Sequence, residues 1–252
     1  MRDWSGRLAD QALVDTFRRN TATVRNRIRQ AAQQAGRRPE DIRLVAVSKT
    51  FPQTYIEAAV EAGLHHLGEN RVQEALQKIA QSTELQIEWH LIGHLQGNKV
   101  RSAAAAFHWI HSVDSVKLLH RIDQAASDQG VTPHLLVQVD LAGEAAKHGA
   151  SLEETRRLLD AAPSCQAAAV CGLMVMPPWN DDPEQARPYF RRLRDLRDEL
   201  VSDGVAVRVT RDLSMGMSHD FEVAIQEGAT IVRVGTAIFG RRTPPAERAT
   251  SV

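Results

Sequence analysis

The run Ile42-Arg43-Leu44-Val45-Ala46-Val47-Ser48-Lys49-Thr50 is an apolar segment that ends abruptly in three polar side chains. A short apolar run of this kind, followed by an amphipathic segment, predicts a buried strand that leads into a helix. The helix is expected over residues 53–62 and is ended by Gly63. The same unit recurs downstream, so this stretch sets the pattern for the whole chain.

Eight strand-to-helix units are expected between residues 42 and 239. The strands are expected at 42–47, 65–67, 87–92, 108–113, 134–141, 170–176, 209–213 and 230–234, and the helices at 53–62, 69–81, 98–106, 115–128, 152–161, 183–202, 218–227 and 236–239. Continuous apolar strands between amphipathic helices indicate a parallel sheet covered on both faces, and eight units favour a closed barrel. The predicted fold class is α/β, a single (β/α)8 TIM-type barrel with an additional N-terminal helix. An open doubly wound sheet is the alternative, disfavoured because no G-x-G-x-x-G follows the first strand.

The chain is expected to divide into three segments. Residues 1–40 form an N-terminal helical segment packed on the barrel, with one long polar helix over 10–36. Residues 41–241 form the barrel, and residues 242–252 form a disordered tail without a pattern. The charged helix expected over residues 183–202 should bury an apolar stripe, made of Tyr189, Leu193, Leu196 and Leu200.

Composition limits the classes of function. Lys plus Arg equals Asp plus Glu at 31 each, which argues against a general nucleic-acid or membrane-surface partner. An N-terminal arginine cluster is more simply explained as a solvated helix face; its members are Arg18, Arg19, Arg25, Arg27 and Arg29. Cys165 and Cys171 form no C-x-x-C pair. Neither a signal peptide nor an apolar run of about 18 residues occurs, so a reducing cytoplasm is the expected compartment.

Polar side chains gather where the predicted strands end, and in a parallel barrel these ends form the site. Lys49 is the most informative of them, because it directly ends a strand that should be buried. Burial lowers the pKa of a lysine, and a neutral amine is a nucleophile toward aldehydes. Position alone equally allows a lysine whose amine snorkels to solvent.

Segments after the seventh and eighth strands decide between these interpretations. Ser214-Met215-Gly216 and Gly235-Thr236 are expected at strand-to-helix transitions, where glycine permits close approach and backbone N–H groups bind phosphate. Each loop alone is explained by ordinary turn and cap usage, with Ser218 as a helix N-cap. Two such loops together with a reactive lysine point to a phosphorylated aldehyde.

Arg233 is a third unusual residue. It lies between Val232 and Val234 in a strand that should be buried, so it needs an acid or a ligand as partner. An arginine that faces the pyridine nitrogen of pyridoxal 5'-phosphate (PLP) would donate to it and keep it unprotonated. That contact weakens the ring as an electron sink.

Six motifs make the chain similar to a known family. They are Val45-Ala46-Val47-Ser48-Lys49-Thr50, Gly68-Glu69-Asn70-Arg71-Val72-Gln73-Glu74, Trp89-His90-Leu91-Ile92-Gly93-His94-Leu95-Gln96-Gly97-Asn98-Lys99, Gly172-Leu173-Met174, Leu213-Ser214-Met215-Gly216-Met217-Ser218-His219-Asp220 and Val232-Arg233-Val234-Gly235-Thr236-Ala237-Ile238-Phe239-Gly240. In combination, over residues 45–240, they closely resemble the pyridoxal phosphate homeostasis protein family, which is related to the N-terminal barrel of alanine racemase.

The resemblance implies a set of cofactor-binding residues. Lys49 would form a Schiff base with PLP, Arg233 would face the pyridine nitrogen, and Asn70 would lie beside the ring. The other cofactor-binding residues would be Ser214, Met215, Gly216, Gly235 and Thr236. The chain departs from the family at Asp140, where the family often has asparagine.

The resemblance also implies a function. The chain would hold PLP in a homeostasis or carrier role without efficient catalysis, as a monomer or a dimer, with PLP-dependent apo-enzymes as partners. A small PLP-dependent amino-acid racemase-like enzyme is the alternative. Racemisation needs a second base opposite Lys49, and the two tyrosines, Tyr55 and Tyr189, are expected in core packing. The chain ends about ten residues after its last predicted helix, so the racemases' second domain is expected to be absent.

Neither a catalytic residue nor a metal site is predicted. His90 and His94 are four apart, but they lie at a strand end and not on one helix face. The other histidines lack a matching pattern of cysteines or carboxylates. Trp89 and Trp109 are expected in the core.

Overall fold

The computed structural model describes residues 10–143 and 148–241. Within these ranges eight parallel strands close into a barrel in chain order, and the last strand pairs with the first. The strands are β1 (Arg43–Val47), β2 (His66–Glu69), β3 (Glu88–Leu91), β4 (Trp109–Val113), β5 (His134–Gln138), β6 (Ala169–Met174), β7 (Asp212–Met217) and β8 (Ile231–Val234). The predicted barrel is therefore confirmed.

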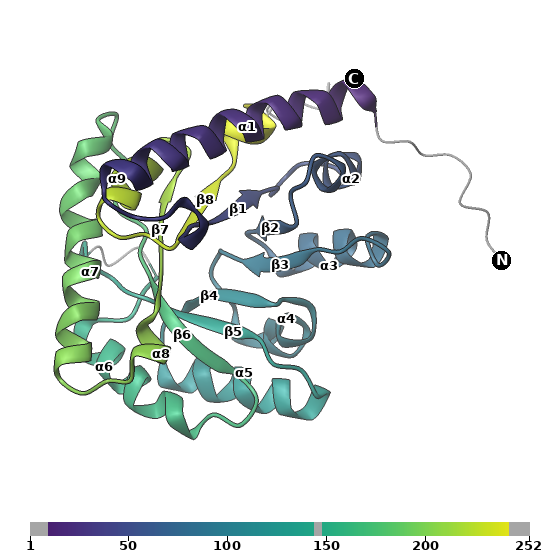
Figure 1. The fold of residues 1–252 in the computed structure, drawn as a ribbon. Helices are drawn as coiled ribbons and strands as arrows, with labels where there is room; N and C mark the ends of the chain where they lie inside the picture. The colour runs from purple at the N-terminus through teal and green to yellow at the C-terminus, as the bar shows by residue number, and fades with distance from the viewer. Residues whose placement is uncertain (1–9, 144–147, 242–252) are drawn as a thin grey trace, which may run out of the picture.

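Helices surround the strands in Figure 1. The α-helices are α1 (Gln11–Gln34), α2 (Gln53–Glu61), α3 (Val72–Gln81), α4 (Val100–Ala106), α5 (Val116–Gln129), α6 (Leu152–Ala161), α7 (Arg187–Ser202), α8 (Val207–Thr210), α9 (Phe221–Gln226) and α10 (Thr236–Phe239), and short 3₁₀ turns are η1 (Pro39–Asp41), η2 (Gly97–Lys99), η3 (Ala162–Ser164) and η4 (Pro183–Ala186). Ser115 and Ser151 begin α5 and α6 by accepting hydrogen bonds from Leu118 N and Glu154 N.

Two apolar layers result from the alternation of side chains along each strand. The outer layer joins strands to helices, and Trp89 belongs to it. The inner layer contains side chains from strands only, namely Val45, Trp109, Leu136, Cys171, Met174 and Ile231. Trp89 and Trp109 are both buried, as predicted.

The barrel interior is also unusually polar. His90, His111 and Ser214 are fully buried, and Arg233 is almost so. Arg233 alternates with the outward-facing Val232 and Val234, so its side chain shares the interior with the inner apolar layer. Buried polar groups need partners, and these side chains make hydrogen bonds to one another.

Helix α1 lies across the outside of the barrel, over α2, α9 and α10 (Figure 1). Its buried residues recur three to four positions apart, as a helix with one apolar face requires; they are Val14, Phe17, Thr21, Val24, Ile28, Ala31 and Ala32. Arginines on the other face are mostly exposed, as expected for a solvated helix surface. Arg27 is the exception, because it pairs with Glu222 at 2.5 Å and covers the Phe221 ring.

The seventh strand differs from the prediction. It was expected at 209–213, but Val207–Thr210 forms the short helix α8 and the strand runs over Asp212–Met217. Ser214, Met215 and Gly216 therefore lie within β7, and the loop position predicted for them is wrong. Gly216 has φ +90°, and a Cβ there would lie 2.6 Å from the Ala224 Cβ, so the strand can pass α9 only with glycine at this position.

One position of the stripe on α7 is also corrected. The buried residues of this helix are Phe190, Leu193, Leu196 and Leu200. Tyr189, predicted in place of Phe190, is only half-buried. The two neighbours fit a helical period almost equally well, and the phenyl ring, which has no hydroxyl to be satisfied, takes the core position.

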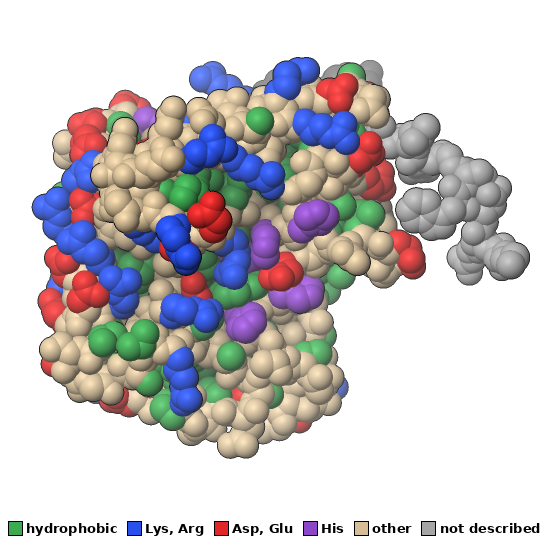
Figure 2. All heavy atoms as spheres, in the orientation of Figure 1, with side chains coloured by type: hydrophobic (Ala, Val, Ile, Leu, Met, Phe, Trp, Pro, Cys, Tyr) green, Lys and Arg blue, Asp and Glu red, His purple; other side chains and the backbone are tan. Residues whose placement is uncertain are grey.

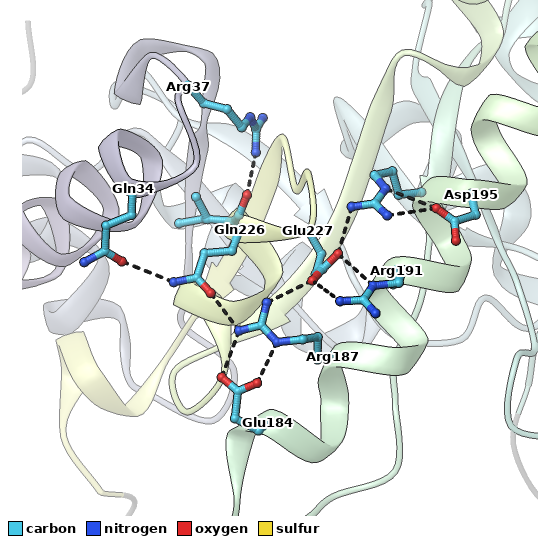
Figure 3. Close-up of polar contacts among 10 residues, drawn as sticks. Gln34, Arg37, Glu184, Arg187, Arg191, Asp195, Gln226 and Glu227 are labelled. Carbon is cyan, nitrogen blue, oxygen red and sulfur yellow. Dashed lines mark hydrogen bonds and ion pairs between the residues drawn. The ribbon is translucent and has the colours of Figure 1, made fainter.

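An acidic side chain at the end of α9 ties this helix to α7 (Figure 3). The buried carboxylate of Glu227 accepts from Arg187, Arg191 and Arg194, with nitrogen-to-oxygen distances of 2.9, 3.2 and 2.8 Å. Burial opposes the charge of Glu227, but hydrogen bonds from the arginines outweigh it and hold the pKa of this carboxyl below its usual value.

The predicted disordered tail, residues 242–252, lies outside the described residues. Among the helices of the described part, none is both long enough and apolar enough to cross a membrane.

Candidate functional site

Lys49 lies in a tight turn directly after β1, at the end of the barrel where all eight strands finish. The lysine is half-buried. The next residue, Thr50, has φ +70°, a conformation that residues other than glycine seldom adopt. Its N–H donates to the Glu74 carboxylate on α3, which holds the turn in this conformation. The sequence therefore placed Lys49 correctly, at the mouth of the barrel.

A buried ion pair lies beneath this turn. Lys78 donates to Ser48 O at 2.9 Å, to Glu69 at 2.7 Å and to Glu74 at 2.9 Å. The Ser48 hydroxyl also donates to Glu69, at 2.6 Å. Burial raises the pKa of Glu69, and the charge of Lys78 opposes that rise without cancelling it. The network joins β1, β2 and α3 around the backbone that carries Lys49.

Backbone donors gather where β8 leads into α10. The Ser218 hydroxyl oxygen accepts from Gly235 N at 3.0 Å and from Ala237 N at 3.4 Å. A Cβ on Gly235 would lie 3.3 Å from Val47 O, so this segment runs close beside the end of β1. Thr236 is the first residue of α10 and is exposed at the mouth.

Ser218 is not a helix cap. The N-cap of α9 is Asp220, whose carboxylate accepts from Met217 N. The prediction that Ser218 caps this helix is therefore wrong. Its hydroxyl instead lies against amide N–H groups at the start of α10, a place suited to an oxyanion.

Ser214 and Met215 lie away from those amides. Ser214 is an interior residue whose hydroxyl accepts from Arg233 at 2.6 Å and lies 2.9 Å from His111 Nδ1. Met215 is fully buried in the outer apolar layer. Of the segments predicted to hold phosphate, the structure thus brings Gly235 and Thr236 to the mouth of the barrel and leaves Ser214 below it.

Arg233 is held rigidly in the interior. Its Nη1 donates to Ser214, and its Nη2 donates to Val175 O at 3.0 Å. Burial lowers the pKa of Arg233 to about 10, and the charge of Asp220 opposes this lowering. The guanidinium is therefore still a cation at neutral pH. Burial, followed by the charge of Arg233, holds the pKa of His111 well below 6.5, so this histidine is neutral.

Asn70 follows β2 at the same end of the barrel and is exposed. A Cβ on Gly93 would lie 2.8 Å from the Asn70 Oδ1, so the absence of a side chain at Gly93 makes room for Asn70. Asp140 caps the turn after β5, because its Oδ1 accepts from Ala142 N and Gly143 N. An asparagine Oδ1 can accept the same two bonds, so the departure from the family pattern at this position preserves the turn.

A pocket of 360 Å³ opens at the mouth on the side of β3, β5 and β6. Its lining combines apolar and polar side chains, among them His94, Asp140, Met176, Trp179 and Met217. Trp179 is 69% exposed and Met176 is 43% exposed. None of the cofactor-binding residues predicted from sequence lines this pocket, so it is distinct from the segments that carry Lys49 and Gly235.

Comparisons with known proteins agree with this geometry. The family model for the alanine racemase N-terminal domain matches residues 19–243. A pyridoxal phosphate homeostasis protein of Aquifex aeolicus is 44% identical over 220 residues, covering 87% of this chain and 95% of the relative. One from Pseudomonas aeruginosa is 42% identical, covering 91% of this chain and 97% of the relative.

The chain belongs to the pyridoxal phosphate homeostasis protein family. A solved structure supports the same assignment. PipY of Synechococcus elongatus, solved with PLP bound, is 38% identical, superposes with a TM-score of 0.79, and the match covers 89% of this chain and all of that one. The family resemblance predicted from the motifs is confirmed.

Several residues of this family member escaped sequence reasoning. Ser218 stood in a recognised motif but was assigned to a cap, because the end of β7 was predicted too early. Lys78 and Glu74 are four apart on α3, a spacing that indicates a surface pair. Only the fold shows that Glu69 joins them from β2 and makes the group a buried one.

Proposed function

We propose that this chain binds PLP covalently through the Lys49 amine and acts in the homeostasis of that cofactor, as a carrier without efficient catalysis. The observation that carries the proposal is the position of Lys49, half-buried at the carboxyl end of β1 and adjacent to the segment of Gly235. An amine at this position can attack an aldehyde that is bound at the mouth of the barrel. The relatives' name and the PLP bound to PipY support the same ligand.

The described residues fit this cofactor at both of its ends. The hydroxyls of Ser218 and Thr236 offer donors for a phosphate, because the Ser218 oxygen accepts from the amides of Gly235 and Ala237 and keeps its own hydrogen for the ligand. Arg233 offers a fixed cation for the pyridine nitrogen, since its two hydrogen bonds use two of the five N–H groups of a guanidinium. PLP itself would supply an aldehyde that reacts with an amine, and a ring that withdraws electrons.

A carrier role is favoured over a racemase-like enzyme because neither Tyr55 nor Tyr189 is placed to act as a second base opposite Lys49. Tyr55 packs between Phe17 and Phe51, with ring centroids 5.3 and 4.9 Å away, in the contact of α1 with α2. Tyr189 lies on α7, outside the barrel. Tyr55 is thus engaged in aromatic packing between helices and Tyr189 lies on an outer helix, so we expect neither tyrosine to return a proton to the face opposite Lys49.

The proposal includes recipients for the cofactor, PLP-dependent apo-enzymes in the cytoplasm. The exposed Trp179 and Met176 support this part, because they border the pocket at the mouth of the barrel. Exposed apolar side chains at a rim suit transient contact with another protein. Release at such a contact requires that PLP be held by a reversible bond, which a lysine amine provides.

The test is reduction of the PLP-loaded protein with borohydride, followed by peptide mass analysis. We expect the cofactor to be fixed on the peptide that contains Lys49, and the visible imine band to disappear in Lys49→Ala. Lys117→Ala, at an exposed lysine, is the control and should keep the band. An unchanged band in Lys49→Ala would refute the site.

The same loaded protein tests the carrier role. Exchange of the α-proton of alanine or serine in deuterated water should stay far below about one per second, near the low end of enzyme turnover. Faster exchange that depends on Lys49 would establish the enzyme instead.

A further inference from the structure

A line of hydrogen-bonding side chains crosses the barrel interior, from the starts of β2 and β3 up to Arg233. His66 Nδ1 lies 3.2 Å from His90 Nε2, and His90 Nδ1 lies 3.0 Å from His111 Nε2. His111 Nδ1 lies 2.9 Å from the Ser214 hydroxyl, which accepts from Arg233. The proposed cofactor function uses only the Arg233 end of this line. The other end lies at the foot of the barrel, where the strands begin.

At the foot, a carboxylate completes a group of three ligand atoms. Glu88 Oε2 lies 3.4 Å from His66 Nδ1, and the ligand atoms of Glu88, His66 and His90 all lie within 4.8 Å of one another. Around a tetrahedral zinc ion with bonds of about 2.0 Å, neighbouring ligand atoms are roughly 3.3 Å apart. The two shorter separations, 3.2 and 3.4 Å, match that spacing.

We propose that His66, Glu88 and His90 bind a divalent transition-metal ion, with zinc the ion that two imidazoles and a carboxylate suit best. We name this group the foot site. It lies at the end of the barrel opposite Lys49, and it does not depend on PLP being bound.

The ligands of the foot site are oriented by further contacts, as metal ligands usually are. His90 is fixed through its other ring nitrogen by His111, in the fully buried interior. Trp109 Nε1 donates to Glu88 Oε2 at 3.1 Å and turns the carboxylate toward the histidines. The rings of His66 and His90 are inclined by 66°, so lone pairs in their planes can converge on one point.

A second group, His94, Asp114 and His148, lies at the mouth, and its ligand atoms are also within 4.8 Å of one another. The lone pairs of its two rings, however, do not converge on one point. Its two imidazoles are stacked, with centroids 3.6 Å apart and planes 9° apart. Lone pairs of parallel, stacked rings point along separate planes, so one ion cannot accept both without rotation of a ring. The second group therefore serves as the internal control.

Ions can reach the foot site through a cavity of 590 Å³ that His66 lines. On the face drawn in Figure 2, histidine side chains gather beside basic and acidic ones. Arg43 lines the same cavity, and its positive charge opposes a cation. The Glu88 carboxylate is the anionic ligand that offsets this charge, so it should be indispensable.

Metal binding at the foot site would change the direction of the hydrogen bonds as far as Ser214, the partner of Arg233. A guanidinium only donates, so the Ser214 hydroxyl accepts from Arg233. The arrangement that gives every hydrogen of the line an acceptor then has the Ser214 hydroxyl donate to His111 Nδ1. His111 then carries its proton on Nε2 and donates to His90 Nδ1. A metal ion on His90 Nε2 reverses this order, because His90 must then carry its proton on Nδ1. His111 remains neutral but carries its proton on Nδ1 instead of Nε2. The hydrogen of the Ser214 hydroxyl then loses its acceptor.

The first test is titration of the full chain, freed of metal and of PLP, with Co²⁺ followed by its visible bands and with Zn²⁺ by calorimetry. We expect one ion per chain. Glu88→Gln and His66→Asn should each weaken binding at least tenfold, and His148→Asn should leave it unchanged. These side chains of Glu88 and His66 are 49% and 30% exposed, so both variants should fold, which circular dichroism would verify. Absence of saturable binding, or loss in His148→Asn alone, would overturn the foot site.

The second test addresses the relay by ¹⁵N NMR of the imidazole nitrogens. On addition of zinc, His111 should change from the Nε2-protonated to the Nδ1-protonated tautomer in the wild type and not in Glu88→Gln. Zinc binding with no change at His111 would overturn the relay. Because PLP is absent from both tests, their failure would be distinct from failure of the proposed cofactor function.

Discussion

Ser214 and Ser218 are four residues apart in one motif, and they contact different parts of the proposed cofactor site. Ser218 lies at the mouth against the amides of Gly235 and Ala237, and Ser214 lies below it, bonded to Arg233. The first serine is therefore placed for the phosphate of PLP. The second is placed to orient the guanidinium that would face the ring.

Ser218→Ala should consequently weaken binding of PLP about fivefold, since one hydrogen bond contributes about 1 kcal/mol. Binding of unphosphorylated pyridoxal should hardly change, because it lacks the group that Ser218 contacts. Thr236→Ala should behave in the same way. The measurement is the dissociation constant for each ligand from the imine absorbance.

Ser214→Ala is the matched control for that experiment. It leaves the mouth intact and disturbs Arg233, so it should change the affinity for PLP and for pyridoxal by the same factor. If Ser218→Ala also weakened both ligands equally, the assignment of Ser218 to the phosphate would be wrong.

The positions of residues in the fold were predictable from sequence where a single residue is informative, and their roles toward PLP stay predictions. Lys49 and Arg233 were placed correctly because a charged residue beside buried apolar neighbours is informative in itself. Ser214 was not placed correctly, because serine occurs equally in strands, in helix caps and in ligand sites. Its partner, His111, comes from a strand 103 positions away, and only closure of the barrel brings them together.

At the scale of elements, α1 supports both segments that carry the proposed site. Phe17 of α1 packs edge-on against Phe239 of α10 at 5.1 Å and against Tyr55 of α2 at 5.3 Å. Asn20 donates to Ile238 O at 2.8 Å. The helix α10 begins at the proposed phosphate donors, and α2 follows the Lys49 turn. Packing of α1 thus fixes the spacing between them.

Phe17→Ala should destabilise the protein by about 3 kcal/mol, as the removal of a fully buried phenyl ring usually does. It should also weaken PLP binding, because α2 and α10 lose a common support. Urea unfolding measures the first effect, and a cofactor titration measures the second. Gln30→Ala, on the exposed face of α1, is the control and should change stability by less than about 0.5 kcal/mol. If Phe17→Ala lost the expected stability, about 3 kcal/mol, but bound PLP with unchanged affinity, α1 would have no role in shaping the site.

Element types were predictable because apolar runs and 3.6-residue periods alternate regularly along the chain. The first and last residues of the elements were less predictable, as β7 illustrates. The segment Val207–Thr210 is rich in β-branched residues and favours a strand by local preference, yet it forms α8. Pairing of Asp212, Leu213 and Ser214 with β6 sets the true start of the strand, and that pairing is a long-range contact.

For the whole molecule, the interior of the barrel combines structural and functional demands. Its apolar layer is made of only a few strand residues, and the remaining interior holds the line from His66 to Arg233. Such an interior buries less apolar surface than one filled with branched aliphatic side chains. Stability must therefore come largely from the outer layer between strands and helices, and from polar contacts that lock the helices together.

The Glu227 group is the clearest of these contacts, and it makes global stability depend on pH. Its pKa is lowered below the usual 4.5, since bonds from the arginines outweigh burial. A carboxyl whose pKa is lower in the folded state contributes stability that is present above the unfolded pKa. That contribution is lost as the pH falls through the folded pKa. The wild type should therefore lose this contribution below about pH 4.5.

Glu227→Gln should lower the free energy of unfolding by about 2 kcal/mol at pH 7, a value reduced for the partial exposure of the three arginines. The difference from wild type should shrink below about pH 4.5, because protonation makes the wild-type carboxyl neutral too. Urea unfolding of both proteins from about pH 3 to about pH 7 measures this difference in the free energy of unfolding. Glu199→Gln, which removes an exposed pair with Arg192 on α7, is the matched control and should cost less than about 1 kcal/mol at any pH. Equal effects of the two substitutions, or a difference that grows as the pH falls, would show that Glu227 does not tie α9 to α7 in the way its three ion pairs indicate.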